Sequence, residues 1–268
     1  MNADMNNRRH LFAVYPALLI AIAVFAPPVL SAAEVTMRLM PAPPAVEADY
    51  AEELAAGWDL SLGYGRLWIE GTAEGALNGA LAGVTYRGVL GDRLGFTAAP
   101  LIAGTFWGEL AGFAADTQSL GSGFSFGSRI LGTADSHNLV IFGGGLYAWG
   151  FDRADEAAGS YRIGSHLFGV SAGLKVRIVP TRKVSFTPFY VYMGGGGRYN
   201  SVVKTSIPFP TTIETTGGLG YTDLHLFGLD FNIYGISAKL TADLFRDEVK
   251  TFTVMIDVLR SVRSFTSD

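Results

Sequence analysis

Residues 168–178 read FGVSAGLKVRI, and this stretch decides the fold. Every second residue is apolar, namely Phe168, Val170, Ala172, Leu174, Val176 and Ile178. The residues between them are glycine, serine or a basic residue. An alternation with a period of two that lasts this long predicts a β-strand with one apolar and one polar face.

The same alternation recurs from Trp58 onward and predicts ten strands. The other nine segments lie near 58–65, 78–90, 94–98, 122–132, 138–151, 183–193, 229–234, 237–244 and 251–258. Their polar faces carry mainly Gly, Ser and Thr, whereas a soluble sandwich would expose more Lys and Glu. A membrane barrel turns its apolar face to lipid and its small polar face to the lumen. We therefore expect an all-β fold, a closed antiparallel transmembrane barrel of ten strands, with eight or twelve as alternative counts.

The composition agrees with an exported membrane protein. The chain of 268 residues is 49% hydrophobic but 16% charged, against roughly 25% charged in ordinary soluble domains. Cysteine is absent, which excludes a disulfide scaffold, a thiolate metal site and a Cys nucleophile. The formal charge of -4 argues against a nucleic-acid partner.

The N-terminus resembles a secretory signal peptide over residues 1–33. Arg8, Arg9 and His10 form a basic region, residues 11–29 carry no charge, and Ser31-Ala32-Ala33 supplies small residues before the predicted cut at Glu34. The alternative is a retained membrane helix, but Pro16, Pro27 and Pro28 interrupt the apolar core.

Between the signal peptide and the barrel we place a leader, residues 34–56. It combines a Pro-rich run with an acidic segment, and we expect it to stay in the periplasm. The alternative is a plug whose Glu47, Asp49, Glu52 and Glu53 meet arginines in the lumen. The barrel itself is assigned to residues 57–268.

The predicted connections alternate in length. The turns near 91–92, 133–137, 180–182 and 235 are short, whereas those at 71–77, 105–121, 152–162 and 200–218 are longer; the link 246–248 is a short exception. Short periplasmic turns and long external loops are typical of outer-membrane barrels.

On this evidence the chain resembles the bacterial outer-membrane β-barrel proteins of about 8 to 12 strands, from roughly Trp58 to Leu259. The resemblance implies outer-membrane localisation in a Gram-negative cell. It also implies contact with outer-membrane lipid, with lipopolysaccharide and with the barrel-assembly machinery. One departure is the C-terminus, which ends on Asp268 rather than on an aromatic residue and leaves Phe265 as the nearest one.

Several charged residues share the predicted lumen parity and form a candidate network: Arg87, Arg129, Lys175, Arg177, Lys239, Asp59, Asp230 and Asp257. Charges inside a narrow barrel must pair or sit in water, so this set is either a plugging network or a constriction that selects charged solutes. Side chains fill the interior of small barrels, which favours the plug. An aromatic girdle at the outer ends of the strands is expected from Tyr147, Trp149, Phe151 and Tyr192.

Enzymatic candidates are few. Asp223 and His225 form an Asp-x-His pair that resembles half of the active site of omptins, the ten-stranded outer-membrane proteases, but the facing Asp-x-Asp pair is missing. No His-x-Ser motif of a lipid A deacylase occurs, and we expect neither a metal site nor a cofactor.

We therefore expect a non-enzymatic envelope protein, structural or a narrow channel. The alternatives are a hydrolase built on Asp223 and His225, an interaction protein that uses its outer loops, above all 200–218, and a soluble β-protein.

Overall fold

A computed structural model describes residues 56–70, 74–110, 113–133, 136–156, 159–181, 183–205, 211–243, 249–259 and 261. The predicted signal peptide, nearly all of the leader and Phe265 lie outside this range. No helix in the described part of the chain is long and apolar enough to cross a membrane.

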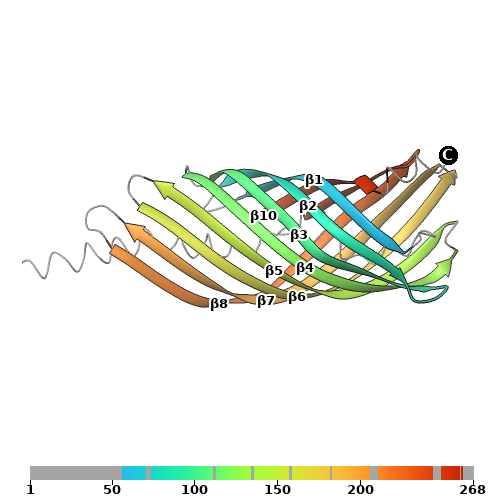
Figure 1. Cartoon of the computed structure of the whole chain (residues 1–268), viewed down its shortest axis with the longest axis horizontal. Helices are drawn as coiled ribbons and strands as arrows, with labels where there is room; N and C mark the ends of the chain where they lie inside the picture. Colours follow the sequence, from blue (N-terminus) through green and yellow to red (C-terminus); the bar gives the residue numbers. More distant parts are fainter. Residues whose placement is uncertain are drawn as a thin grey trace, which may run out of the picture.

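Ten strands close into one antiparallel barrel, in which each strand pairs with its neighbours in sequence and β1 pairs with β10 (Figure 1). They are β1 (Gly57–Ile69), β2 (Gly75–Val89), β3 (Leu94–Leu110), β4 (Phe113–Gly132), β5 (Asn138–Glu156), β6 (Gly159–Thr181), β7 (Val184–Thr205), β8 (Thr211–Ile233), β9 (Ile236–Asp243) and β10 (Val249–Asp257). The predicted fold class and strand count are confirmed.

Short connections gather at one end of the barrel, which we call the turn end. They link β2 to β3, β4 to β5, β6 to β7 and β8 to β9. The tightest is Tyr234-Gly235, where both residues have positive φ, 52° and 89°. Two such residues form the hairpin turn whose twist matches that of the flanking strands.

At the opposite end, which we call the hairpin end, three expected loops are largely strand. β3 and β4 continue to within three residues of each other across 105–121, and β5 and β6 do the same across 152–162. The expected loop 200–218 is a projecting hairpin, with Thr205 paired to Thr211. Alternation in the sequence does not reveal these extensions. Outside the membrane neither face of a strand has to be apolar or polar throughout, so the residue types stop alternating while the backbone hydrogen bonds continue.

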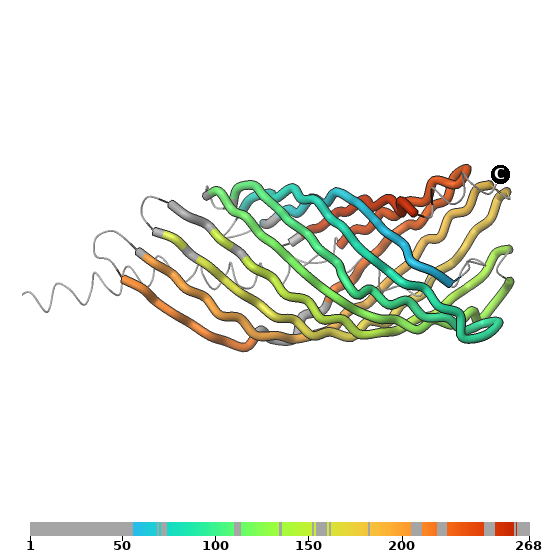
Figure 2. The backbone as a smooth tube through the Cα atoms, in the orientation of Figure 1, coloured from blue at the N-terminus to red at the C-terminus, as the bar shows by residue number. Residues whose placement is uncertain are grey.

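The wall of the barrel is tall on one side only. β6 and β8 have 23 residues each, whereas β9 has 8 and β10 has 9. Among the described strands, only β7 pairs with residues 211–225 of β8, because β9 begins to pair at Leu226. Figures 1 and 2 show the hairpins β5–β6 and β7–β8 reaching furthest from the turn end.

The two faces of the wall differ sharply in chemistry. Large apolar side chains are exposed on the outer face of several strands; Phe168 and Val170 on β6 are each 63% exposed. The alternate residues point into the lumen, where Lys175 is fully buried. An apolar band of this kind around a closed barrel is the surface that contacts lipid.

Candidate functional site

An ion-pair triad in the lumen is carried by β6, β8 and β9, with β7 between the first two of these strands. Lys175 on β6 donates a hydrogen bond from Nζ to Asp230 Oδ2 on β8 over 3.2 Å. Lys239 on β9 lies directly opposite Asp230, with its Nζ 3.5 Å from Oδ1. The alternation of each strand brings these side chains to one face, and strand pairing brings them to one depth. One carboxylate therefore lies between two ammonium groups.

Phe189 on β7 lies beside both ammonium groups. Lys175 Nζ lies 5.5 Å from the centroid of its ring and Lys239 Nζ lies 5.4 Å from it. Cations at this distance from an aromatic ring are attracted by its quadrupole, more strongly when water is excluded. The aromatic ring and the triad thus form one connected group of side chains in the lumen.

A second group of charges lies on the strands that complete the barrel. Arg87 on β2 pairs with the buried carboxylate of Asp59 on β1. Asp257 on β10 accepts hydrogen bonds from Ser61 over 2.6 Å and from Ser237 over 3.2 Å. Each of the three predicted lumen acids therefore has a hydrogen-bond or ion-pair partner, which a carboxylate needs when it leaves water.

Arg129 and Arg177 flank β5 near the turn end. Arg129 pairs in register with Val140 and Arg177 with Asn138, so the two arginines lie on either side of the same strand. Both are half-buried. With the triad and the second group they form a ring of charges around the turn half of the lumen, which we call the charge belt.

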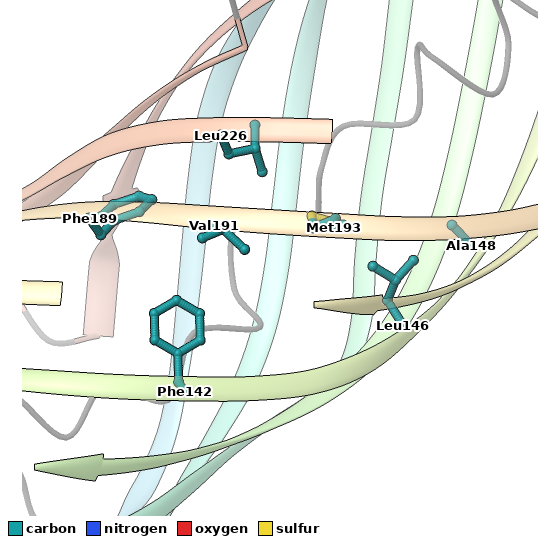
Figure 3. Packing of buried hydrophobic residues seen from close by; sticks show 7 residues of the cluster. All are labelled: Phe142, Leu146, Ala148, Phe189, Val191, Met193 and Leu226. Carbon is teal, nitrogen blue, oxygen red and sulfur yellow. The ribbon is translucent and has the colours of Figure 1, made fainter. Parts of the chain in front are cut away.

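Apolar side chains occupy the lumen beyond the charge belt. Seven buried residues from three strands pack together: Phe142, Leu146, Ala148, Phe189, Val191, Met193 and Leu226. Figure 3 shows Phe142 on β5 pointing toward Val191 and Phe189 on β7. A second cluster joins β1, β2, β3, β4 and β10 through Leu67, Leu77, Leu81, Phe106, Ala115 and Met255.

These clusters correct the expectation of a lumen lined by small polar residues. The signal was present in the sequence: Phe189, Val191 and Met193 share the parity of Ser185 and Thr187. Leu77 and Phe106 fell in segments read as loops. β2 and β3 extend beyond the segments predicted from alternation, so the prediction assigned neither residue to a face of the barrel.

The four predicted girdle residues all lie on the outer face. Trp149 and Phe151 stack on β5 with ring centroids 6.2 Å apart, and Tyr147 contacts Phe168 on β6 at 4.8 Å. Tyr192 contacts His225 with its ring edge at 5.4 Å. In the register with β6, Tyr147, Trp149 and Phe151 lie from Phe168 toward the hairpin end, whereas Tyr192 lies opposite Ala172 within the apolar wall.

Two histidines are held on the outer wall in the same manner. His166 Nδ1 lies 2.6 Å from the Tyr147 hydroxyl, and His225 Nδ1 lies 2.7 Å from the Tyr190 hydroxyl. Each histidine begins the sequence His-Leu-Phe-Gly, and each tyrosine also contacts the phenylalanine of that sequence. This repeated arrangement was not recognised in the sequence, although the four-residue repeat was its visible signal.

The two hydrolase candidates, Asp223 and His225, both lie on β8. His225 faces outward with Phe227, because the register of β7 and β8 shows no shift near Gly228. Asp223 pairs through its backbone with Gly194, and its side chain lies outside the described part. Among the described residues, no three His, Asp or Glu side chains gather as metal ligands.

Comparison with protein-family models and with curated proteins finds no match. Solved structures do match. The translocator domain of the autotransporter NalP from Neisseria meningitidis is 14% identical over 85% of this chain and 95% of its own, with a TM-score of 0.52. The transport unit of the autotransporter AIDA-I from Escherichia coli is 10% identical over 84% and 95%, with a TM-score of 0.50. The outer membrane protease OmpT from Escherichia coli is 9% identical over 77% and 97%, with a TM-score of 0.47.

Identities this low concern the fold alone. The two autotransporter structures share with this chain a closed barrel over most of both lengths. The chain therefore has the fold of the bacterial outer-membrane β-barrels, and this fold together with the exposed apolar wall places it in the outer membrane.

Proposed function

We propose that this protein is a non-enzymatic structural barrel of the outer membrane, with a filled lumen and with its tall hairpins held outside the cell. The observation that carries the proposal is Lys175, whose side chain is fully buried between Asp230, Phe142 and Phe189. A lysine that lines an aqueous pore would keep its ammonium group in water. Here protein groups take the place of that water.

The apolar clusters support the same conclusion. Leu and Phe side chains in the lumen lower the free energy of the closed barrel only while they exclude water, and a hydrated pore would expose both clusters. Barrels of about eight strands have an interior that side chains can just fill, whereas open channels belong to barrels of about sixteen or more. Ten strands stand near the filled limit.

The tall wall suggests what the barrel carries. A spanning strand needs about 9–11 residues, and β5 to β8 each have at least 19. The surplus lies at the hairpin end, opposite the turn end. If short turns face the periplasm, as in other barrels, these hairpins stand on the cell surface and form the part available to partners.

The position of His225 supports a non-enzymatic protein. Its ring is engaged by Tyr190 and Tyr192 on the outer wall, and it does not face a lumen or cleft that would hold a substrate. A general base needs a substrate proton within reach, and the lipid-facing wall offers none to a peptide.

Single-channel recording tests the proposal. The protein refolded from detergent, with its folding verified by a heat-sensitive gel shift, is inserted into planar bilayers beside a conducting porin as a positive control. We expect no discrete openings from the wild type. A second variant, Phe142→Ala with Phe189→Ala, removes the largest rings of the lumen cluster and is expected to leak. If the wild type gives reproducible, ion-selective openings that change with Arg129→Gln, the structural proposal is wrong and the protein is a narrow channel.

A further inference from the structure

The outward side chains of β6 change from apolar to polar along the strand, as expected where it leaves the hydrocarbon layer. From Ile178 to Phe168 every outward side chain is apolar, over about 33 Å of strand at ~3.3 Å per residue. With a strand tilt of about 40° this corresponds to a height of about 25 Å, the thickness of the apolar band on outer-membrane barrels. His166 is the next outward residue, and Arg162 follows four positions further. Both therefore lie at the level of the lipid headgroups.

Two basic residues of β7 join them there. Arg198 lies directly opposite His166 in the register, and Lys204 lies opposite Ser160, diagonal to Arg162. All four side chains are exposed. Within the part of the chain that the structure describes, Arg162, Arg198 and Lys204 make no ion pair. We call these four residues the outer basic cluster.

The cluster consists of a lower and an upper pair, and the exposed Arg153 on β5 lies directly opposite Arg162 and extends the upper pair. His166 and Arg198 form the lower pair, and Arg162 and Lys204 form the upper one. The pairs are separated by four residues along β6, or about 13 Å. Three acids lie nearby in the strand register: Asp116 opposite Arg153, Asp155 opposite Ser160, and Glu214 opposite Val202. None of them faces the lower pair.

Tyr147 prepares His166 to donate a hydrogen bond away from the barrel. The Tyr147 hydroxyl lies 2.6 Å from Nδ1 of His166. When this hydroxyl donates to Nδ1, the neutral ring carries its proton on Nε2, which becomes a donor. The neighbouring rings of Trp149 and Phe168 mark the interface between hydrocarbon and headgroups.

Two glycines keep the surface between these residues open. Gly164 faces outward between His166 and Arg162, and a Cβ added there would meet no atom within 4 Å. Gly218 lies opposite Arg198 and is equally open. Donors from β6 and β7 thus border a stretch of outer wall at headgroup depth where the two glycines carry no side chain.

We propose that the outer basic cluster binds the two phosphates of the lipid A headgroup of lipopolysaccharide, one at each basic pair. Charge-assisted hydrogen bonds to phosphate are the strongest contacts that these side chains make. A diphosphorylated headgroup suits two separate pairs, whereas an ordinary phospholipid would occupy only one. The proposal deepens the structural role above and rests on it only for the orientation of the hairpin end.

The test is binding of diphosphoryl lipid A to the full-length protein refolded in a neutral detergent, followed by native mass spectrometry. Monophosphoryl lipid A and phosphatidylglycerol are the comparison lipids. We expect binding to weaken in that order, and to weaken further as salt is raised. The double variant Arg162→Gln with Arg198→Gln should bind diphosphoryl lipid A at least about tenfold more weakly, since each lost charge-assisted bond is worth about that factor.

Arg66→Gln is the matched control. Arg66 is an exposed, outward arginine on β1, packed over Trp68 at 5.2 Å and remote from the cluster. It should leave binding unchanged, whereas Gly164→Leu should weaken binding by covering the bare wall without removing a charge. Equal loss in the Arg66 variant, wild-type binding by the double variant, or equal affinity for phosphatidylglycerol would overturn the proposal. Channel openings in the bilayer experiment would overturn the filled lumen and leave this result standing.

Discussion

Lys175 and His166 lie on the same strand, nine residues apart, and face opposite media. Lys175 points into the lumen, where Asp230 and two aromatic rings surround it and no part of it is exposed. His166 points outward and is bound on one side only, by Tyr147. Its other ring nitrogen remains available to the surroundings.

The difference shows how one strand assigns two roles to polar groups. A buried ion is stable only when protein groups replace its water, so a lumen charge becomes part of the structure. A charge at headgroup depth keeps contact with water and lipid, so its partners can come from outside the protein. Changes on the inner face should therefore alter folding, and changes on the outer face should alter binding.

The largest effect is expected from Asp230→Ala. The substitution leaves Lys175 and Lys239 without their shared carboxylate and should lower the free energy of unfolding by about 3–5 kcal/mol. Urea titration in detergent micelles, read by the heat-sensitive gel shift, measures it. The triple variant Lys175→Met, Asp230→Leu, Lys239→Met should recover most of the loss. A wild-type midpoint for Asp230→Ala would mean that the triad is not a structural unit.

A matched pair of phenylalanines compares the two faces directly. Phe189→Ala leaves a void in the lumen cluster and removes the ring that lies beside two ammonium groups, so we expect a loss of about 3 kcal/mol. Phe168→Ala removes an equal side chain from the outer wall, where lipid or detergent fills the space, and should lower stability by about 1 kcal/mol or less. The same urea titration measures both. Equal losses would contradict the distinction between a packed interior and a solvated wall.

The two Tyr–His pairs predict a smaller, repeated effect. Tyr147→Phe and Tyr190→Phe each remove one hydroxyl bonded to a histidine and should each lower stability by about 0.5–1.5 kcal/mol. The two variants should differ in lipid binding. Only Tyr147→Phe should weaken the binding of diphosphoryl lipid A, because only His166 lies opposite an arginine in the register. If both variants weaken lipid A binding equally, His166 has no specific role in that binding.

The smallest effect, that on hydrolysis, is expected from His225→Ala. We expect neither the wild type nor this variant to cleave fluorogenic peptides or to release fatty acid from lipid A. Stability should fall by about as much as in Tyr190→Phe, because both substitutions remove the same hydrogen bond. Hydrolysis by the wild type that His225→Ala abolishes would restore the hydrolase hypothesis.

How far the sequence predicts the structure depends on which medium each face meets. In residues 168–178 lipid and lumen impose opposite demands on alternate positions, so the alternation reveals strand, face and depth together. Beyond the membrane this contrast ends. The strand extensions at 105–121 and 152–162 were therefore read as loops, although their backbone pairing continues.

Sequence alone determined the closed barrel, its ten strands and the face on which each charge of the belt lies, because alternation is a local property of the chain. It could not decide which charges meet. Lys175, Asp230 and Lys239 are joined only by the registers that run from β6 through β7 and β8 to β9, and the same pairing brings Phe189 beside the two lysines. The Tyr–His pairs and the outer basic cluster likewise exist only across strands. Register is set by the closure of the whole barrel, so only the tertiary structure could decide these contacts.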